Sequence, residues 1–346
     1  MLDELPETLD ETYKRILREI NKAKREHAHR LLQCITVAVR PLRIVAEVLM
    51  VDFGTISGGE TWKLKPDWRW EDQEQAVLST CSSLIAVVDG DGDQVVQFSH
   101  FSVKEFLTSP WLADSTPDVS RFHIPLGPAH VILARACLGT LLRLEDHVNP
   151  YNIKDRFPLA RYAAKHWVKH AQFKDVLSQL REGMEILFDP HGPYFSAWIR
   201  VHDIDVQRPS LSTLHYFTWS YSYKPAVAPL YYAALCGFQS LAEHLIDNCS
   251  QKVNVRGGYC VSPLLAALAG CHFKTAQLLY ERGGDIHVPG YGRRTLLHAS
   301  SITGQIEIVQ WLLSHDADPN VWEQDGWTPL FLAARNGWLG TIRILL

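Results

Sequence analysis

The 346-residue sequence predicts a mainly α-helical protein whose C-terminal third is an array of helical repeats. Two observations carry this prediction. Helix-ending residues recur in steps of 34, 33 and 33 residues, at Gly237, Cys271, Gly304 and Gly337. After them come apolar stripes with helical spacing, such as Ile308, Val309 and Leu312. A fixed period of this length is the pattern of stacked helix pairs.

The residues at the start of the repeats favour the beginning of a helix. Pro229, Pro263 and Pro329 fall in a first helical turn, where a missing N–H costs nothing, and Thr328 is placed to cap its helix. Together with the exit Ala317–Asn320, this Thr-Pro-Leu pattern with a period of 33 residues resembles the ankyrin repeat, a β-turn followed by two antiparallel helices. The resemblance implies a solenoid that binds partner proteins along a concave surface and rarely does chemistry.

Some positions depart from the ankyrin pattern. Leu296 replaces the usual proline, Ser300-Ser301 replaces Ala-Ala, and Cys271 replaces a glycine. The last unit stops at Leu346 inside an apolar outer helix, whereas a finished solenoid ends in a polar cap. We therefore expect about four repeats over residues 228–346, the last one truncated, as the beginning of a longer array.

Composition narrows the class of protein. The chain is 47% hydrophobic and 21% charged, as in a globular protein, and its net charge of −4 gives no general attraction to nucleic acid or anionic membrane. The acidic start, Met1–Glu4, lacks the regions of a signal peptide, and no apolar run reaches the length of a membrane span. The 7 cysteines form no C-x-x-C pair, which favours free thiols in a reducing compartment. We expect a cytoplasmic protein that binds neither nucleic acid nor membrane.

The first 112 residues combine helices with one hairpin. Thr8 and Glu11 form the capping pattern of a helix over residues 5–20. Further helices are expected over 29–39, from Pro41 onward, over 71–83, and from a second capping box at Ser102 to Pro110. Strands at 84–88 and 95–98 flank the turn-forming Asp89–Asp93, which lacks the terminal glutamate of a calcium loop. Helices followed by a two-stranded wing predict a winged-helix domain.

Three segments of this region resemble a known family. Leu5–Tyr13, Arg40–Leu42 and Phe98–Leu107 are similar to the segment that follows the nucleotide-binding domain in fungal NACHT proteins, which are NLR-like (STAND) signal-transduction ATPases. The same module is labelled a winged helix of the GPI inositol-deacylase type. Pro158–Val168 also resembles the helical linker of that family.

The resemblance implies an order of domains. The expected domains are a NACHT-associated winged helix at 1–112, a helical linker at 113–200, an irregular linker or cap at 201–227, and ankyrin repeats at 228–346. In this interpretation the repeats are a ligand or partner sensor. The winged helix is the switch contact to a nucleotide-binding domain upstream.

The sequence carries no recognisable catalytic motif. It contains neither the G-x-x-x-x-G-K-[ST] loop nor the G-x-S-x-G elbow, so we expect no enzyme activity and no cofactor. His166 and His170 lie one helical turn apart and could share a metal, but no third ligand accompanies them, so packing histidines and no metal are expected. An accessory role to a NACHT ATPase or hydrolase whose catalytic domain lies upstream stays open as an alternative.

Two further roles depend on the winged helix. In NLR-like ATPases a winged-helix histidine contacts the β-phosphate of bound ADP, and His100 is the candidate for such a nucleotide-domain contact; the alternative is simple packing at the strand end. Winged helices also bind DNA. The helix expected over 71–83 would be the DNA reader, yet it carries Glu71, Asp72 and Glu74 and no Lys or Arg. DNA binding is therefore the alternative function and not the favoured one.

Ankyrin ligands usually meet the tips of the β-turns and the exposed end of the inner helix. The candidate partner-binding residues at turn tips are Tyr259, Tyr291, Arg294, Gln324, Asp325 and Trp327. Those near the ends of inner helices are Leu235, Ile302, Arg335 and Asn336. Tyr, Trp and Arg are the residue types that carry most binding energy at interfaces. The alternative for the tyrosines is packing against neighbouring turns.

Overall fold

The computed structural model describes residues 8–43, 83–89, 94–144, 153–205, 228–258, 260–289 and 293–346. Within these residues the chain is mainly helical, as predicted, and forms two compact units. The first unit runs to Leu187 and includes Arg200–His202; the second holds Phe188–Ile199 and Asp203–Leu346. In the described part, no helix is long and apolar enough to cross a membrane.

The units differ from the expected domains at two places. The expected winged-helix region and helical linker share the first unit, so no division falls at residue 112. Most of α11 (Tyr194–Val201), which was expected in the linker, belongs to the second unit. Aromatic packing is the reason, because Phe195 and Trp198 contact Tyr232 of the first repeat with ring centroids 5.5 and 6.2 Å away. Helix α11 therefore covers the start of the repeat array.

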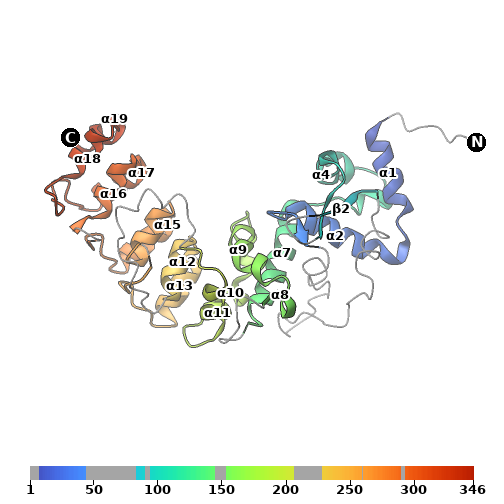
Figure 1. Cartoon of the computed structure of the whole chain (residues 1–346), viewed down its shortest axis with the longest axis horizontal. Helices are drawn as coiled ribbons and strands as arrows, with labels where there is room; N and C mark the ends of the chain where they lie inside the picture. The colour runs from blue at the N-terminus through green and yellow to red at the C-terminus, as the bar shows by residue number, and fades with distance from the viewer. Residues whose placement is uncertain are drawn as a thin grey trace, which may run out of the picture. The chain divides into compact units, whose positions relative to one another are not determined.

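The first unit combines helices with one three-stranded sheet (Figure 1). Its elements are α1 (Leu9–Glu19), η1 (Lys22–Lys24), α2 (Arg25–Val37), β1 (Leu42–Arg43), β2 (Ile85–Asp89), β3 (Gln94–Phe98), α4 (Phe101–Thr108), α5 (Pro110–Ala113), α6 (Pro117–Ser120), α7 (Leu126–Leu141), α8 (Ile153–Arg156), α9 (Ala160–Ala171), η4 (Leu177–Gln179) and α10 (Arg181–Leu187). Helix α7 packs against α2 and α9, and this contact forms the centre of the unit's core.

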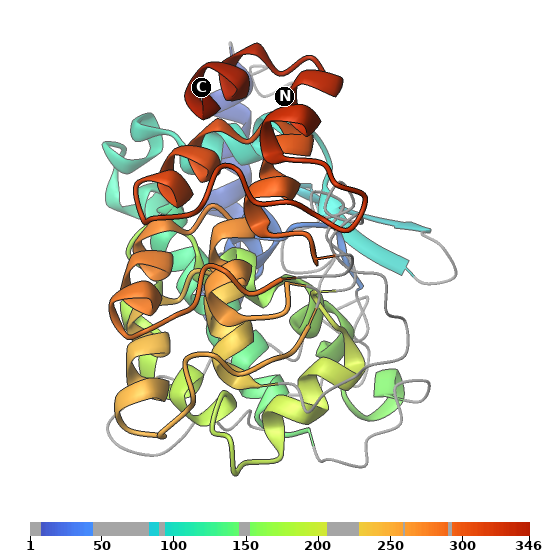
Figure 2. The ribbon, with the colours of Figure 1, turned by 90° about the vertical axis from the view of Figure 1, so that its left-hand side faces the viewer.

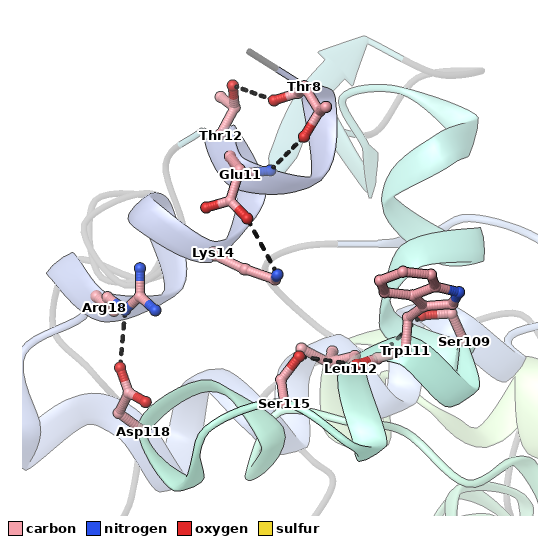
Figure 3. Close-up of polar contacts among 10 residues, drawn as sticks. All are labelled: Thr8, Glu11, Thr12, Lys14, Arg18, Ser109, Trp111, Leu112, Ser115 and Asp118. Atoms are coloured by element: carbon pink, nitrogen blue, oxygen red, sulfur yellow. Dashed lines mark hydrogen bonds and ion pairs between the residues drawn. The ribbon is translucent and has the colours of Figure 1, made fainter. Parts of the chain in front are cut away.

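Helix α1 begins where the sequence predicts a cap. Thr8 accepts a hydrogen bond from the backbone N–H of Glu11, but the Glu11 carboxylate pairs with Lys14, so only half of the expected capping box forms. Figure 3 shows these contacts together with the ion pair between Arg18 and Asp118, which joins α1 to α6. Both partners of this pair are substantially exposed, so its contribution to stability is small.

The sheet has the strand order β1-β3-β2, and both strand pairs are antiparallel. Strands β2 and β3 form the expected hairpin; residues 90–93 of its turn and nearly all of the helix expected over 71–83 lie outside the described residues. The prediction of a helix from Pro41 is wrong at Leu42 and Arg43, which form β1 and pair with Val96 and Val95. Leu42 becomes fully buried there, and proline suits the start of an edge strand because it has no N–H to donate.

Helix α4 is capped by His100, and the prediction that Ser102 opens the helix is wrong. The His100 Nδ1 accepts the backbone N–H of Ser102 at 3.3 Å and lies 2.6 Å from the Ser102 Oγ. The same Oγ lies 2.7 Å from the hydroxyl of Tyr13, so Ser102 joins α4 to α1. At the end of α4, Ser109 accepts the N–H of Leu112 and caps α5 (Figure 3).

The described residues of the helical linker expected over 113–200 are mainly helical, and η4 and α10 are separate elements there. Asp175, which precedes η4, has a left-handed backbone with φ of 63°, so no continuous helix runs from α9 into η4.

The described residues of the second unit form four helix pairs. They are α12 (Pro229–Leu235) with α13 (Gln239–Asp247), α14 (Pro263–Ala269) with α15 (Phe273–Glu281), α16 (Leu296–Thr303) with α17 (Ile306–Leu313), and α18 (Pro329–Arg335) with α19 (Leu339–Leu345). Figures 1 and 2 show the pairs as consecutive layers. Inner helix α12 packs on α14 and α16 on α18, while Tyr280, Trp311 and His315 join the outer helices α15 and α17.

The residue that ends each inner helix is left-handed, as the repeat pattern predicts. Gly237, Gly304 and Gly337 have φ of 72°, 71° and 77°, and Cys271 has φ of 57°. At Gly304 a second constraint acts, because a Cβ built there would lie 2.4 Å from the indole of Trp338 in the next repeat. The indole N–H of Trp338 also donates to the carbonyl of Ile302 at 2.8 Å. Gly304 therefore ends helix α16 and also leaves room for the Trp338 side chain of the following repeat.

We expect Gly304→Ala to destabilise the chain more than Gly337→Ala. Both substitutions place a side chain in the left-handed region, which costs roughly 1–2 kcal/mol. Only Gly304→Ala adds a clash, with Trp338, because nothing lies within 4 Å of a Cβ at Gly337. Urea unfolding of the two variants measures the difference, and equal losses would mean that Trp338 does not pack on Gly304.

Cys271→Gly is expected to stabilise the second unit. Cys271 is the one helix-ending residue of the four that carries a side chain in the left-handed region, and removing its Cβ relieves a strain of about 1 kcal/mol. Thermal unfolding of this variant should show a raised midpoint. Cys271→Ala is the control, because it removes the thiol and keeps the Cβ; a similar rise for this variant would attribute the effect to the sulfur and not to the backbone.

Candidate partner-binding surface

The loop between α17 and α18 presents most of the predicted turn-tip residues. It is closed by two backbone hydrogen bonds, from Glu323 N–H to the Trp327 carbonyl at 3.1 Å and from Gly326 N–H to the Glu323 carbonyl at 3.0 Å. Gly326 has φ of 77°, which allows this tight turn. The turn leaves Gln324 and Asp325 exposed.

Arg294 is held inside the array and is not a free turn-tip cation. Its guanidinium donates to the Glu323 carboxylate at 2.8 Å, and the two side chains are only 14% and 1% exposed. Asp325 lies 4.0 Å from the same guanidinium. Because Glu323 belongs to the next repeat, this ion pair holds two successive turns together. We therefore assign Arg294 mainly to the structure of the array.

Trp327, in the turn before α18, and Arg335, within α18, form a stacked pair. The Arg335 guanidinium carbon lies 4.6 Å from the centroid of the Trp327 ring, a cation–π distance. The ring of Phe331, one helical turn before Arg335, lies 5.4 Å from Trp327. Arg335 and Phe331 are exposed and Trp327 is half-buried. Among the described residues, Arg335 has no acidic partner in an ion pair.

The remaining candidates fall into three groups. Asn336 is exposed and Ile302 is partly exposed, so both are accessible. Leu235 is completely buried, so the prediction that it contacts a partner is wrong: α12 packs on α14 and leaves its inner end no free surface. Tyr259 and Tyr291 lie outside the described residues.

The structure exposes apolar residues that the sequence analysis did not select. In the second unit these are Trp322, Phe331, Trp338, Leu339 and Leu346. Phe331 occupies the position that Tyr231, Leu265 and His298 occupy in earlier repeats, where all three are buried. Aligning the repeats gives this equivalence, and the exposed fraction of each side chain comes from the structure.

His100 remains accessible on the first unit. Its Nδ1 is occupied by Ser102, its ring lies 4.3 Å from that of Phe101, and Phe101 is 69% exposed. In the described part, no hydrogen bond to its Nε2 is found. His100 therefore has one nitrogen available for an outside acceptor or donor.

His166 and His170 do not share a ligand geometry. The described residues contain no group of three or more His, Cys, Asp or Glu side chains that could hold a metal ion. Instead, His170 bonds through Nε2 to the Tyr162 hydroxyl at 2.8 Å and through Nδ1 to the His130 Nδ1 at 2.9 Å. The backbone N–H of Val39 donates to the same Tyr162 hydroxyl at 3.1 Å. The hydrogen-bonded series therefore joins the segment after α2 to α9 and α7.

Neutral imidazoles satisfy this hydrogen-bonded series. Because Val39 donates to Tyr162, the single phenolic hydrogen is free to donate to His170, whose own hydrogen then faces His130. Burial, with smaller effects of His130, His166 and Lys169, lowers the pKa of His170 to about 3. Burial, followed by the charge of Arg40 and nearby lysines, lowers the pKa of His166 to about 4. Both effects favour uncharged histidines in the folded unit.

The comparisons with known proteins agree with this architecture. Residues 264–346 match the family model for ankyrin repeats, in 3 copies, so the chain carries ankyrin repeats; the match covers the last three helix pairs. The chain is also similar to azaphilone pigments biosynthesis cluster protein L of Monascus ruber, with 30% identity over 302 residues. That similarity covers 82% of this chain and 61% of the relative, so the chain spans less than two thirds of the relative's length.

Acidification should destabilise the first unit. An unfolded histidine has a pKa of about 6.5, so between that pH and the lowered pKa of the buried histidine the unfolded state binds more protons. The neutral, buried His170 contributes fully to the free energy of unfolding above pH ~6.5. This contribution is lost as the pH falls toward the pKa of His170 in the folded unit, about 3. Its loss contributes about 1.4 kcal/mol per pH unit for one fully buried group.

Urea unfolding between neutral and mildly acidic pH measures this slope. His170→Gln should flatten the dependence, because the titrating group is gone. His191→Gln, at an exposed histidine, should leave the slope unchanged. A wild-type slope that does not change in His170→Gln would show that His170 is not the group responsible.

Proposed function

We propose that this chain is a non-catalytic protein-interaction and regulatory segment whose ankyrin repeats bind a partner. The observation that carries the proposal is the ankyrin array, on which Trp327 at a turn and Arg335 on an inner helix form a stacked pair. Ankyrin repeats generally bind proteins, and aromatic and arginine side chains supply most of the energy at such interfaces. The exposed turn residues Gln324 and Asp325 extend the same surface.

The finer proposal places the chain in an NLR-like protein. In it, the first unit is a winged-helix and linker module that contacts a nucleotide-binding domain outside this chain. The strand order β1-β3-β2 after two helices supports the winged helix, because that order joins the first strand to the distal strand of the hairpin. The close packing of α7 on α2 and α9 supports a rigid link between the winged helix and the helices C-terminal to it.

His100 is the proposed contact to a bound nucleotide in that arrangement. Its accessible Nε2 and its place at the N-terminus of α4 support contact with an anionic group. His100→Ala in a longer protein that contains the nucleotide domain should release ADP faster. Unchanged ADP retention would remove His100 from the proposal without affecting partner binding by the repeats.

A second candidate role comes from the fungal relative. Its name assigns that protein to a pigment biosynthesis cluster, and the similarity extends over most of this chain. We infer from this, as the second candidate, that the partner of the repeats is a protein encoded with biosynthetic enzymes. The two roles differ in the partner, a signalling protein in one and a biosynthetic or regulatory protein in the other, and share the same binding surface.

The binding function is tested with a surface variant and a matched control. Trp327→Ala combined with Arg335→Ala should abolish retention of specific partners in quantitative capture from host extract, with the thermal midpoint nearly unchanged. Lys274→Ala combined with Gln310→Ala, at exposed positions of the outer helices α15 and α17, should retain them. Equal retention by both variants would contradict the proposed surface, and a lowered midpoint in the first would identify Trp327 as a structural residue.

A further inference from the structure

We propose that Thr116, in the loop between α5 and α6, is a phosphorylation site for a proline-directed protein kinase, and that Arg18 of α1 binds the phosphate group. The inference concerns the first unit alone and does not depend on partner binding by the repeats. Three features of the described residues support it: a hydroxyl that has no capping role, an accessible loop, and an arginine that already reaches this loop.

A serine or threonine directly before proline is the pair that proline-directed kinases recognise, and the sequence contains four such pairs. They are Ser109-Pro110, Thr116-Pro117, Ser262-Pro263 and Thr328-Pro329. In each pair the proline is the first residue of a helix. The sequence alone therefore gives four equivalent candidates, and only the hydrogen bonds and the burial of the hydroxyl residues separate them.

Three of the four hydroxyl groups cap the helix that follows them. Ser109, Ser262 and Thr328 each accept the backbone N–H of the residue three positions further on, at 3.3 or 3.4 Å. A phosphate on any of these oxygens would break that cap. Ser262 is also only 1% exposed. Thr116 accepts no capping hydrogen bond and is exposed, so its phosphorylation leaves the start of α6 intact.

The loop around Thr116 is accessible to a kinase. Thr116 has an extended backbone, with φ of −60° and ψ of 148°. Its neighbours Ala113, Asp114 and Pro117 are exposed, and Ser115 is half-buried. In the reaction, the bond between the γ-phosphorus of ATP and its bridging oxygen breaks and a bond from that phosphorus to the Thr116 Oγ forms. The hydroxyl proton passes to the catalytic aspartate of the kinase, and ADP leaves.

Thr116 and Arg18 already meet at one carboxylate. The Arg18 Nε donates to the Asp118 Oδ2 at 2.8 Å (Figure 3). Hydrogen bonding to Thr116, followed by that to Arg18, lowers the pKa of Asp118 to about 2. A phosphate on Thr116 carries about two negative charges and three strong acceptor oxygens. It therefore competes with Asp118 for Arg18, and paired hydrogen bonds to the guanidinium strengthen the link between α1 and α6.

Treatment of the folded chain with a purified mitogen-activated protein kinase and ATP tests the site. Mass spectrometry should find nearly stoichiometric phosphate on Thr116. Thr116→Ala should abolish this incorporation, and Pro117→Ala should remove most of it although the hydroxyl is still present. Ser109→Ala is the matched control and should leave incorporation unchanged. A folded chain that takes up no phosphate, or takes it up chiefly at Ser109, Ser262 or Thr328, would overturn the proposal.

Phosphorus NMR of the phosphorylated chain tests the arginine contact. The second pKa of a phosphothreonine is about 6, and an adjacent guanidinium lowers it because it stabilises the more negative form. This pKa should therefore be lower in the wild type than in Arg18→Gln. Arg15→Gln, at an exposed position of the same helix, should leave it unchanged. Equal values in the wild type and Arg18→Gln, or equal shifts in both variants, would show that Arg18 does not bind the phosphate.

Discussion

The repeat array depends on side chains that reach from one repeat into the turn or helix end of a neighbouring repeat. Tyr231 meets the backbone of Cys260, His298 lies against the carbonyl of Trp327, and Trp338 donates to Ile302 while its ring covers Gly304. A single helix pair cannot bury its own apolar face, so these contacts decide where each repeat sits on its neighbour. Helix α11 supplies the same cover at the first repeat through Phe195 and Trp198.

The same contacts explain why equivalent positions have different roles. Leu235 and Arg335 occupy one position of the repeat, yet Leu235 is fully buried and Arg335 is exposed over Trp327. Tyr231 and Phe331 differ in the same way. The place of a residue in the repeat therefore does not fix its burial, because burial depends on the side chains that the neighbouring repeat supplies.

The first unit contains a series of hydrogen bonds in its interior. Tyr162 and His170 receive the backbone of Val39 on one side and His130 on the other, so a buried series of hydrogen bonds connects three segments. Unpaired polar groups are costly in such an environment, which makes the neutral state of these histidines a condition of the fold. An accessible His100 on the same unit is free of this requirement.

The sequence by itself determined the repeat period, the helix starts at Pro263 and Pro329, and the left-handed ends at Gly304 and Cys271, because these depend on backbone chemistry within a few residues. Tertiary structure decided the rest. Leu42 joined a strand because β3 offered it a partner and a buried place, and Arg294 became structural because Glu323, from the next repeat, folds against it. Contacts between residues far apart in the sequence outweigh local secondary-structure propensity where they bury a side chain. A short segment of sequence does not show which distant residue will make such a contact.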